Sequence, residues 1–139
     1  MGEGELTPAA GSGDVPAPLR LDVFATVLHR QAGDAGALLA LLADRLARAL
    51  PEAVKVSHRG PFGTGRVTGV AIRLPAAHFE LHRGPAGALA ATTGRAVGGV
   101  VLRRDAVPVD RWIDDLAVAL DALAAGSESA SHALRSIVS

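Results

Sequence analysis

The sequence predicts an α+β protein, a two-layer sandwich in which an antiparallel meander of four or five strands is covered by helices. Apolar residues recur at helical spacing from Asp22 until just before Pro51. They alternate with polar residues through the middle of the chain, and helical spacing returns after Pro108. Strands grouped between helices in this way favour antiparallel pairing, with one N-terminal and two C-terminal helices flanking the sheet.

Residues 1–18 are predicted to form a disordered tail, and residues 19–139 a single α+β domain. The tail is rich in Gly and Pro and has no periodic apolar pattern, so folding would not offset its ordering entropy. A chain of 139 residues that is 49% hydrophobic is typical of one domain.

The first core element is predicted to be a helix with Phe24, Leu28, Leu38 and Leu42 on its apolar face. The segment Gly33-Asp34-Ala35-Gly36 interrupts it, because Gly is unfavourable inside a helix and Asp is a good N-cap. We therefore expect either a kinked helix or two helices that share one apolar stripe.

Five segments have the pattern of strands, and Gly-containing pairs at 60–61, 84–85 and 94–95 separate most of them. The predicted strands are 54–59, 69–74, 78–82, 86–93 and 96–102. The fifth segment is apolar on both faces and contains Gly98 and Gly99, where we expect a bulge or a close backbone approach. Such a strand needs cover on two sides, which favours a homo-oligomer.

The chain is predicted to end with two helices. Asp110 is expected to cap the first, whose apolar face carries Trp112, Ile113 and Leu116, and Gly126 suits its end. Ser127 is then expected to cap a short last helix.

Composition argues against several classes of function. Fourteen basic and 14 acidic residues balance, so no net field favours nucleic acid. The absence of Cys excludes disulfides and thiol nucleophiles. No apolar run is long enough to cross a membrane, and no export signal is present, so we expect a cytoplasmic protein without membrane insertion.

His78, Glu80 and His82 form the most suggestive polar pattern, because alternate residues of a strand lie on one face. Two imidazoles and a carboxylate at this spacing could bind zinc if a further ligand came from a neighbouring element. The alternative is the solvated face of a strand whose Phe79 and Leu81 are buried.

Other patterns point to structure rather than chemistry. The glycine-rich segment 60–65 lacks the Gly-Lys-Ser/Thr ending of a phosphate loop and is predicted to be a hairpin connection, with Phe62 folding back or meeting a partner. Ser57-His58 and Ser131-His132 are neighbours whose side chains diverge, so neither predicts a catalytic pair. No catalytic residue and no cofactor is predicted.

Two hypotheses about function follow. The first is a non-enzymatic protein-binding or adaptor module, chaperone-like and expected to self-associate as a homodimer. The second is a small-molecule or metal-binding protein that uses His78, Glu80 and His82. The order of elements is similar to that of secretion chaperones and nucleoid-associated YbaB-type proteins, but no residue motif accompanies this resemblance, so it assigns no functional residue.

Overall fold

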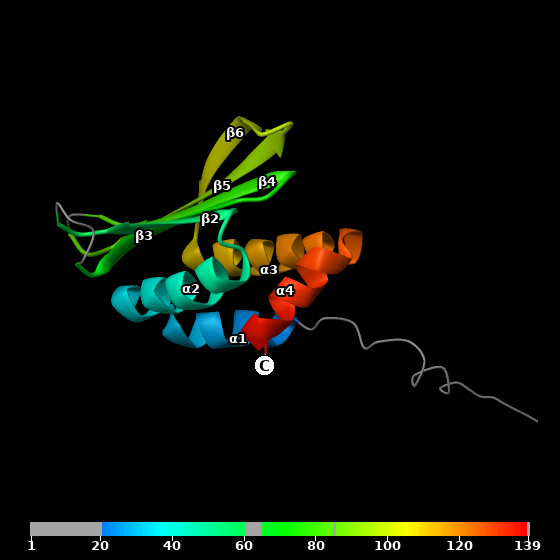
Figure 1. Cartoon of the computed structure of the whole chain (residues 1–139). Coiled ribbons are helices and arrows are strands. Elements are labelled where there is room, and N and C mark those ends of the chain that lie inside the picture. The colour runs from blue at the N-terminus through cyan, green and yellow to red at the C-terminus, as the bar shows by residue number, and fades with distance from the viewer. Residues whose placement is uncertain (1–20, 61–64, 85, 139) are drawn as a thin grey trace, which may run out of the picture.

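The computed structural model describes residues 21–60, 65–84 and 86–138 (Figure 1). Its elements are α1 (Leu21–Gln31), α2 (Ala35–Ala49), β2 (Val54–His58), β3 (Val67–Arg73), β4 (Ala77–Arg83), β5 (Leu89–Val97), β6 (Val100–Val107), α3 (Val109–Gly126) and α4 (Glu128–Val138). The predicted tail, residues 1–18, and Phe62 lie outside the described residues.

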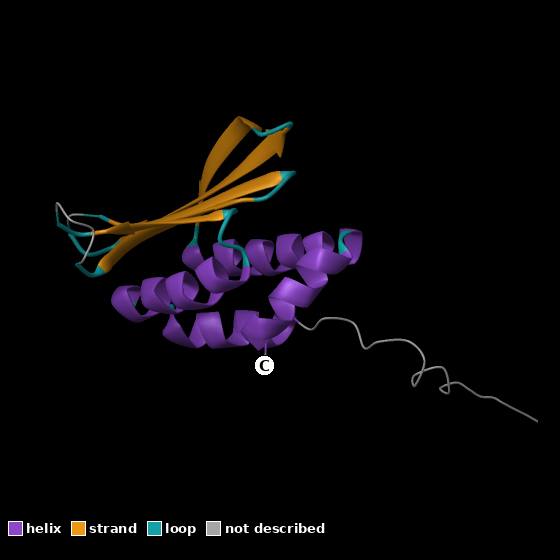
Figure 2. Cartoon of the chain, viewed as in Figure 1, coloured by secondary structure: helices purple, strands orange, loops and turns teal. Residues whose placement is uncertain are grey.

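The predicted α+β architecture is confirmed. One five-stranded sheet has the order β2-β3-β4-β5-β6, and every neighbouring pair is antiparallel. The helices gather on one side of it, as Figure 2 shows. Helices α2 and α3 contact the strands, and α1 packs on α3 and α2 from the side away from the sheet. No helix in the described ranges has the length and apolarity needed to cross a bilayer.

The hydrophobic core lies between the sheet and the helices. Alternation along the strands points Ile72, Phe79 and Leu81 toward the helical layer, where each is at most 3% exposed. Leu38, Leu42 and Leu46 of α2 meet them together with Trp112, Ile113, Leu116 and Leu120 of α3, and all seven are fully buried.

The N-terminal helical segment is two helices rather than one. Asp34 has an extended backbone and its side chain accepts a hydrogen bond from the backbone N–H of Ala37 at 3.0 Å, which starts α2. The shared apolar stripe persists, since Leu28 of α1 and Leu38 of α2 belong to one core. Ser127 caps α4 as predicted, by accepting a hydrogen bond from the N–H of Ala130 at 3.2 Å.

The connection between the last two strands differs from the prediction. We expected a turn at Gly94-Arg95 and a strand through Gly98, but β5 runs through Gly94 and the turn is at Gly98-Gly99. Both turn glycines have positive φ, 57° and 83°, which suits a tight hairpin. Gly94 instead permits a close approach of β6, because a Cβ there would lie 2.8 Å from the carbonyl oxygen of Arg103.

The start of α3 also corrects a prediction. Pro108, and not Asp110, is the N-cap residue, and it offers no side-chain hydrogen bond. Proline has a φ that suits this position, and the carbonyl of Pro108 accepts the bond from the N–H of Trp112 at 2.9 Å. Asp110 is left in the first turn, where its carboxylate is free to reach another helix.

Candidate functional site

His78, Glu80 and His82 lie on β4, on the face of the sheet that points away from the helices. Phe79 and Leu81 alternate with them and are buried in the core, as the sequence predicted. The three polar residues are opposite Arg73, Ala71 and Gly69 of β3 and Gly94, Thr92 and Ala90 of β5.

His78 is buried although no helix covers this face. Its exposed fraction is 4%. Its neighbour Gly94 has no side chain, and a Cβ on Gly94 would lie 3.5 Å from the Cβ of His78 and 3.2 Å from Cγ1 of Val101. The β5–β6 hairpin therefore covers the imidazole. A fully solvated strand face is thus wrong at His78, whereas His82 is exposed.

The imidazole of His78 belongs to a small polar cluster, in which Oε2 of Glu80 lies 3.5 Å from Nε2 of His78 and 3.5 Å from Nη1 of Arg104. Burial lowers the pKa of His78, and Arg104 and Arg73 lower it further against the opposing effect of Glu80. A neutral imidazole is therefore favoured near neutral pH. Its Nε2 is buried and forms no hydrogen bond within the part of the chain that the structure describes.

The structure brings together only two of the three residues predicted to bind zinc, so the ligand set is incomplete. Across the described ranges, no group of three or more His, Asp or Glu side chains is arranged to hold a metal ion. His78 and Glu80 are brought together, while His82 has no contact with either that would complete the set. Zinc binding at this face remains a prediction.

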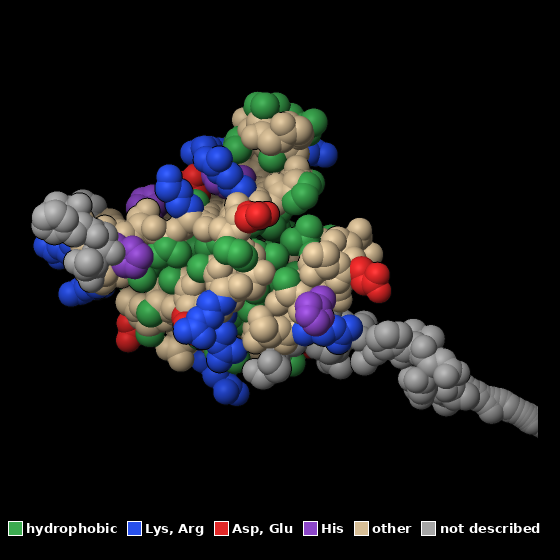
Figure 3. Space-filling view, in the orientation of Figure 1, with side chains coloured by type: hydrophobic (Ala, Val, Ile, Leu, Met, Phe, Trp, Pro, Cys, Tyr) green, Lys and Arg blue, Asp and Glu red, His purple; other side chains and the backbone are tan. Residues whose placement is uncertain are grey.

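The β5–β6 hairpin rises away from the helical layer (Figure 1). Three large apolar side chains on it are exposed: Val97 by 61%, Val100 by 61% and Leu102 by 63%. Hydrophobic atoms gather at its tip in the space-filling view (Figure 3). β6 also ends the strand order, so one side of its backbone has no neighbouring strand among the described residues. The sequence predicts that segment 96–102 needs further cover, and the structure leaves these three apolar side chains of the segment exposed.

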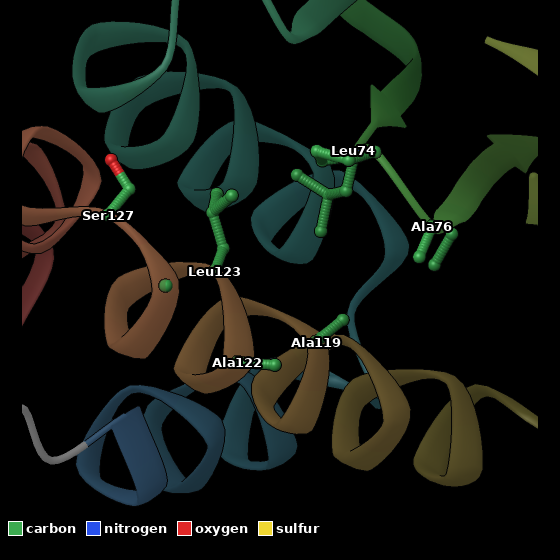
Figure 4. Close-up of a pocket in the computed structure, with 9 residues that line it drawn as sticks. Leu74, Ala76, Ala119, Ala122, Leu123 and Ser127 are labelled. Atoms are coloured by element: carbon green, nitrogen blue, oxygen red, sulfur yellow. The ribbon is translucent and has the colours of Figure 1, made fainter. Parts of the chain in front are cut away.

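An apolar pocket of about 400 Å³ lies between the β3–β4 connection and the C-terminal half of α3. Figure 4 shows Leu74 and Ala76 on one wall and Ala119, Ala122 and Leu123 on the other. Its walls are almost entirely aliphatic. The pocket is within the size range of small-ligand sites but lacks the convergent polar groups that orient a ligand.

Sequence reasoning missed a cluster between α1 and α3. Nδ1 of His29 lies 3.1 Å from Asp110 and its Nε2 lies 2.8 Å from Asp114. The hydrogen bond with Asp114 is the main cause of the raised pKa of His29, and burial opposes it. Local sequence patterns do not reveal this cluster, because His29 is more than 80 residues away from both Asp110 and Asp114 in the sequence.

The serine–histidine neighbours do not form catalytic pairs. Among the described residues, no hydrogen bond joins the side chains of Ser57 and His58 on β2, or those of Ser131 and His132 on α4. On α3, Oδ2 of Asp115 forms an ion pair with Nε of Arg111 at 3.6 Å.

No protein-family model matches this chain, and no curated protein and no solved structure shows a significant similarity to it.

Proposed function

We propose that this protein is a non-enzymatic binding module that self-associates by pairing β6 of one copy with β6 of another. The observation that carries the proposal is the exposure of Val97, Val100 and Leu102 on a hairpin whose outer strand is an open edge. An open strand edge presents unpaired backbone N–H and C=O groups, and exposed apolar side chains beside it favour association.

The sequence of β6 suits one register of a two-fold antiparallel pair. If Arg104 faces its own copy, Leu102 faces Ala106 and Arg103 faces Asp105 of the second copy. The Arg103–Asp105 match occurs twice because of the symmetry. Arg104 would meet a like charge, but its guanidinium already contacts Glu80, at 3.5 Å, on the outer face of the sheet. Opposite charges directly across a strand pair are stabilising.

This register allows a charge-swap test. Alone, Arg103→Asp and Asp105→Arg each place like charges opposite one another, so each variant should be mainly monomeric by sedimentation at concentrations where the wild type is dimeric. Mixed together, the two variants should form a heterodimer, because each new charge then meets its opposite. Both substitutions remove the contact within one strand between Arg103 and Asp105, whose Nε–Oδ2 distance is 3.1 Å. The heterodimer also lacks this contact in both copies, so its loss cannot explain the recovery of dimer formation in the mixture.

An apolar pair of variants provides the matched control. Leu102→Ser should weaken the dimer, because Leu102 is 63% exposed and faces Ala106 of the second copy in this register. Val118→Ser removes a similarly exposed apolar side chain, 69% accessible, from α3 and should leave the dimer unchanged. A wild-type protein that sediments as a monomer at all accessible concentrations, or a dimer indifferent to the charge swap, would refute the proposal.

A second candidate function is ligand binding at the cluster of His78, Glu80 and Arg104. One observation favours it: the buried Nε2 of His78, although 3.5 Å from Oε2 of Glu80, forms no hydrogen bond with any described residue. Leaving such a group without a hydrogen bond costs about 1 to 3 kcal/mol. Calorimetric titration with zinc tests the metal version directly. Saturable heat that disappears in both His78→Ala and His82→Ala would support it, and an absence of heat at micromolar metal would reject it.

A further inference from the structure

Three arginines converge at the end of the sheet where β2 meets β3 and β4 meets β5. Arg59, Arg66 and Arg83, together with Thr68, line an open pocket of about 630 Å³, whose other described walls are Gly84, Ala86 and Gly87. None of its described walls carries an acidic side chain.

Strand register brings these side chains onto one face. The N–H of Arg59 bonds the carbonyl of Arg66 at 2.9 Å, so the two residues are opposite each other. Ser57 pairs with Gly69 and His58 with Val67, so Thr68 is the extra residue of a bulge, and Arg66 and Thr68 line the same pocket. Because Gly69 is opposite His82, Thr68 lies beside Arg83 on the next strand. Three neighbouring strands thus contribute to one polar surface.

Thr68 and Arg83 lie on the helical side of the sheet, because Thr68 is two residues from the buried Val70 and Arg83 two residues from the buried Leu81. Nη1 of Arg83 lies 3.7 Å from the position that a Cβ on Gly36 would occupy, in the first turn of α2. Oδ1 of Asp34, the N-cap residue of α2, lies 3.6 Å from the same position, so its carboxylate opposes the positive end of the helix dipole there.

The three pocket arginines differ from several other arginines of the described residues in having no carboxylate within ion-pair distance. Arg48, Arg103, Arg104 and Arg111 each lie within 3.6 Å of a carboxylate. None of the three pocket arginines forms an ion pair with a described carboxylate. Guanidinium groups gathered in this way repel one another, and an anion placed between them relieves that repulsion.

We infer that this pocket binds the phosphate group of a small molecule. The guanidinium fork matches the oxygens of a phosphate. The hydroxyl of Thr68 already donates to the carbonyl oxygen of Ser57 at 3.3 Å, so the arginines supply the donors. The volume is within the range of small-molecule sites. A nucleic-acid strand fits less well, because no described wall residue is aromatic and none can stack on a base. The inference is independent of the β6 interface, which lies on other residues.

Calorimetric titration of the full chain with pyrophosphate and with inorganic phosphate, at constant ionic strength held by sodium chloride, tests the site. We expect saturable binding of one equivalent, stronger for pyrophosphate. Arg83→Gln and Arg59→Gln should each weaken binding about tenfold or more, because each removes charge-assisted hydrogen bonds. Arg135→Gln removes the same charge from the exposed surface of α4 and should leave the affinity unchanged.

Each alternative has its own result. Arg83→Lys keeps the positive charge but not the two-pronged guanidinium group, so partial retention of affinity supports phosphate recognition. Far-ultraviolet circular dichroism checks that the variants are folded. Absence of saturable heat with both probes overturns the inference, as does equal weakening by Arg135→Gln. Binding of an oligothymidine strand without binding of pyrophosphate also overturns it, in favour of a nucleic-acid site.

Discussion

The indole Nε1 of Trp112 donates a hydrogen bond to the main-chain carbonyl oxygen of Thr92, at 3.1 Å. Trp112 is in the first turns of α3 and Thr92 is in the middle of β5, so this bond connects the helical layer to the sheet. The ring of Trp112 also meets that of Phe79 edge-on, with centroids 6.0 Å apart. Trp112 is fully buried, and its polar atom is satisfied.

Trp112→Phe should lower the free energy of unfolding by about 1 to 3 kcal/mol, because it removes this hydrogen bond and leaves unfilled volume in the core. Urea denaturation followed by circular dichroism measures the change. Val118→Ala, on the exposed side of the same helix, is the control and should change stability by less than about 0.5 kcal/mol. Equal effects of the two substitutions would contradict the role of Trp112.

Gly94→Ala should destabilise the sheet by about 1 to 3 kcal/mol, because the added Cβ would meet the backbone of β6. The relevant distance is 2.8 Å to the carbonyl oxygen of Arg103. Gly126→Ala is the matched substitution at the end of α3, where nothing lies within 4 Å of the new Cβ. It should be neutral or stabilising by up to about 1 kcal/mol. Thermal denaturation of both variants measures the contrast.

Asp34→Ala should lower the free energy of unfolding by about 1 kcal/mol, because α2 loses the side-chain acceptor of its first turn. Asp44→Ala removes an exposed carboxylate from the same helix, together with its 3.1 Å contact with Arg48. Such a surface pair contributes only about 0.3 to 0.5 kcal/mol. Urea titrations that rank Asp44 above Asp34 would show that the cap is not important for α2.

The His29 cluster should make stability depend on pH. The folded-state pKa of His29 is raised above 6.5, mainly by Asp114, so folding favours the protonated form. Its contribution is complete below the unfolded pKa and is lost as pH rises through the raised folded pKa. Asp22 and Asp121 line the same groove and add negative charge. We expect the melting temperature to fall as the pH rises above the unfolded pKa and through the raised folded-state pKa of His29.

His29→Gln should abolish most of this pH dependence, because glutamine does not titrate in that range. His132→Gln replaces an exposed histidine of α4 and serves as the control. A profile that is unchanged in His29→Gln would assign the pH dependence to another group.

Local patterns predicted the type of every element, since alternation and helical spacing are encoded within a few residues. The predicted position of the β5–β6 turn was wrong, because Gly94 and Gly98 both suited a turn. Gly94 and Gly98 look alike in the sequence, and only the approach of the Arg103 backbone to Gly94 distinguishes a strand glycine from a turn glycine. That approach depends on the pairing of β5 with β6, which a single strand does not specify.

The candidate sites were predictable only in part. Alternation placed His78 and Glu80 on one face correctly, but the burial of His78 depends on the hairpin that covers it. The pocket of Arg59, Arg66 and Arg83 requires the registers of three strands at once. Sequence patterns are local to each segment, so they do not reveal a site that several strands share.

The strict meander has a consequence for the order in which the molecule assembles. Each strand pairs with its sequence neighbour, so the hairpins close short loops at small entropic cost. The contact of α1 with α3 must instead close a loop of more than 80 residues, as His29 and Asp110 show. We therefore expect α1 to dock after the sheet has formed, and its amide protons to exchange with solvent sooner than those of β3 and β4.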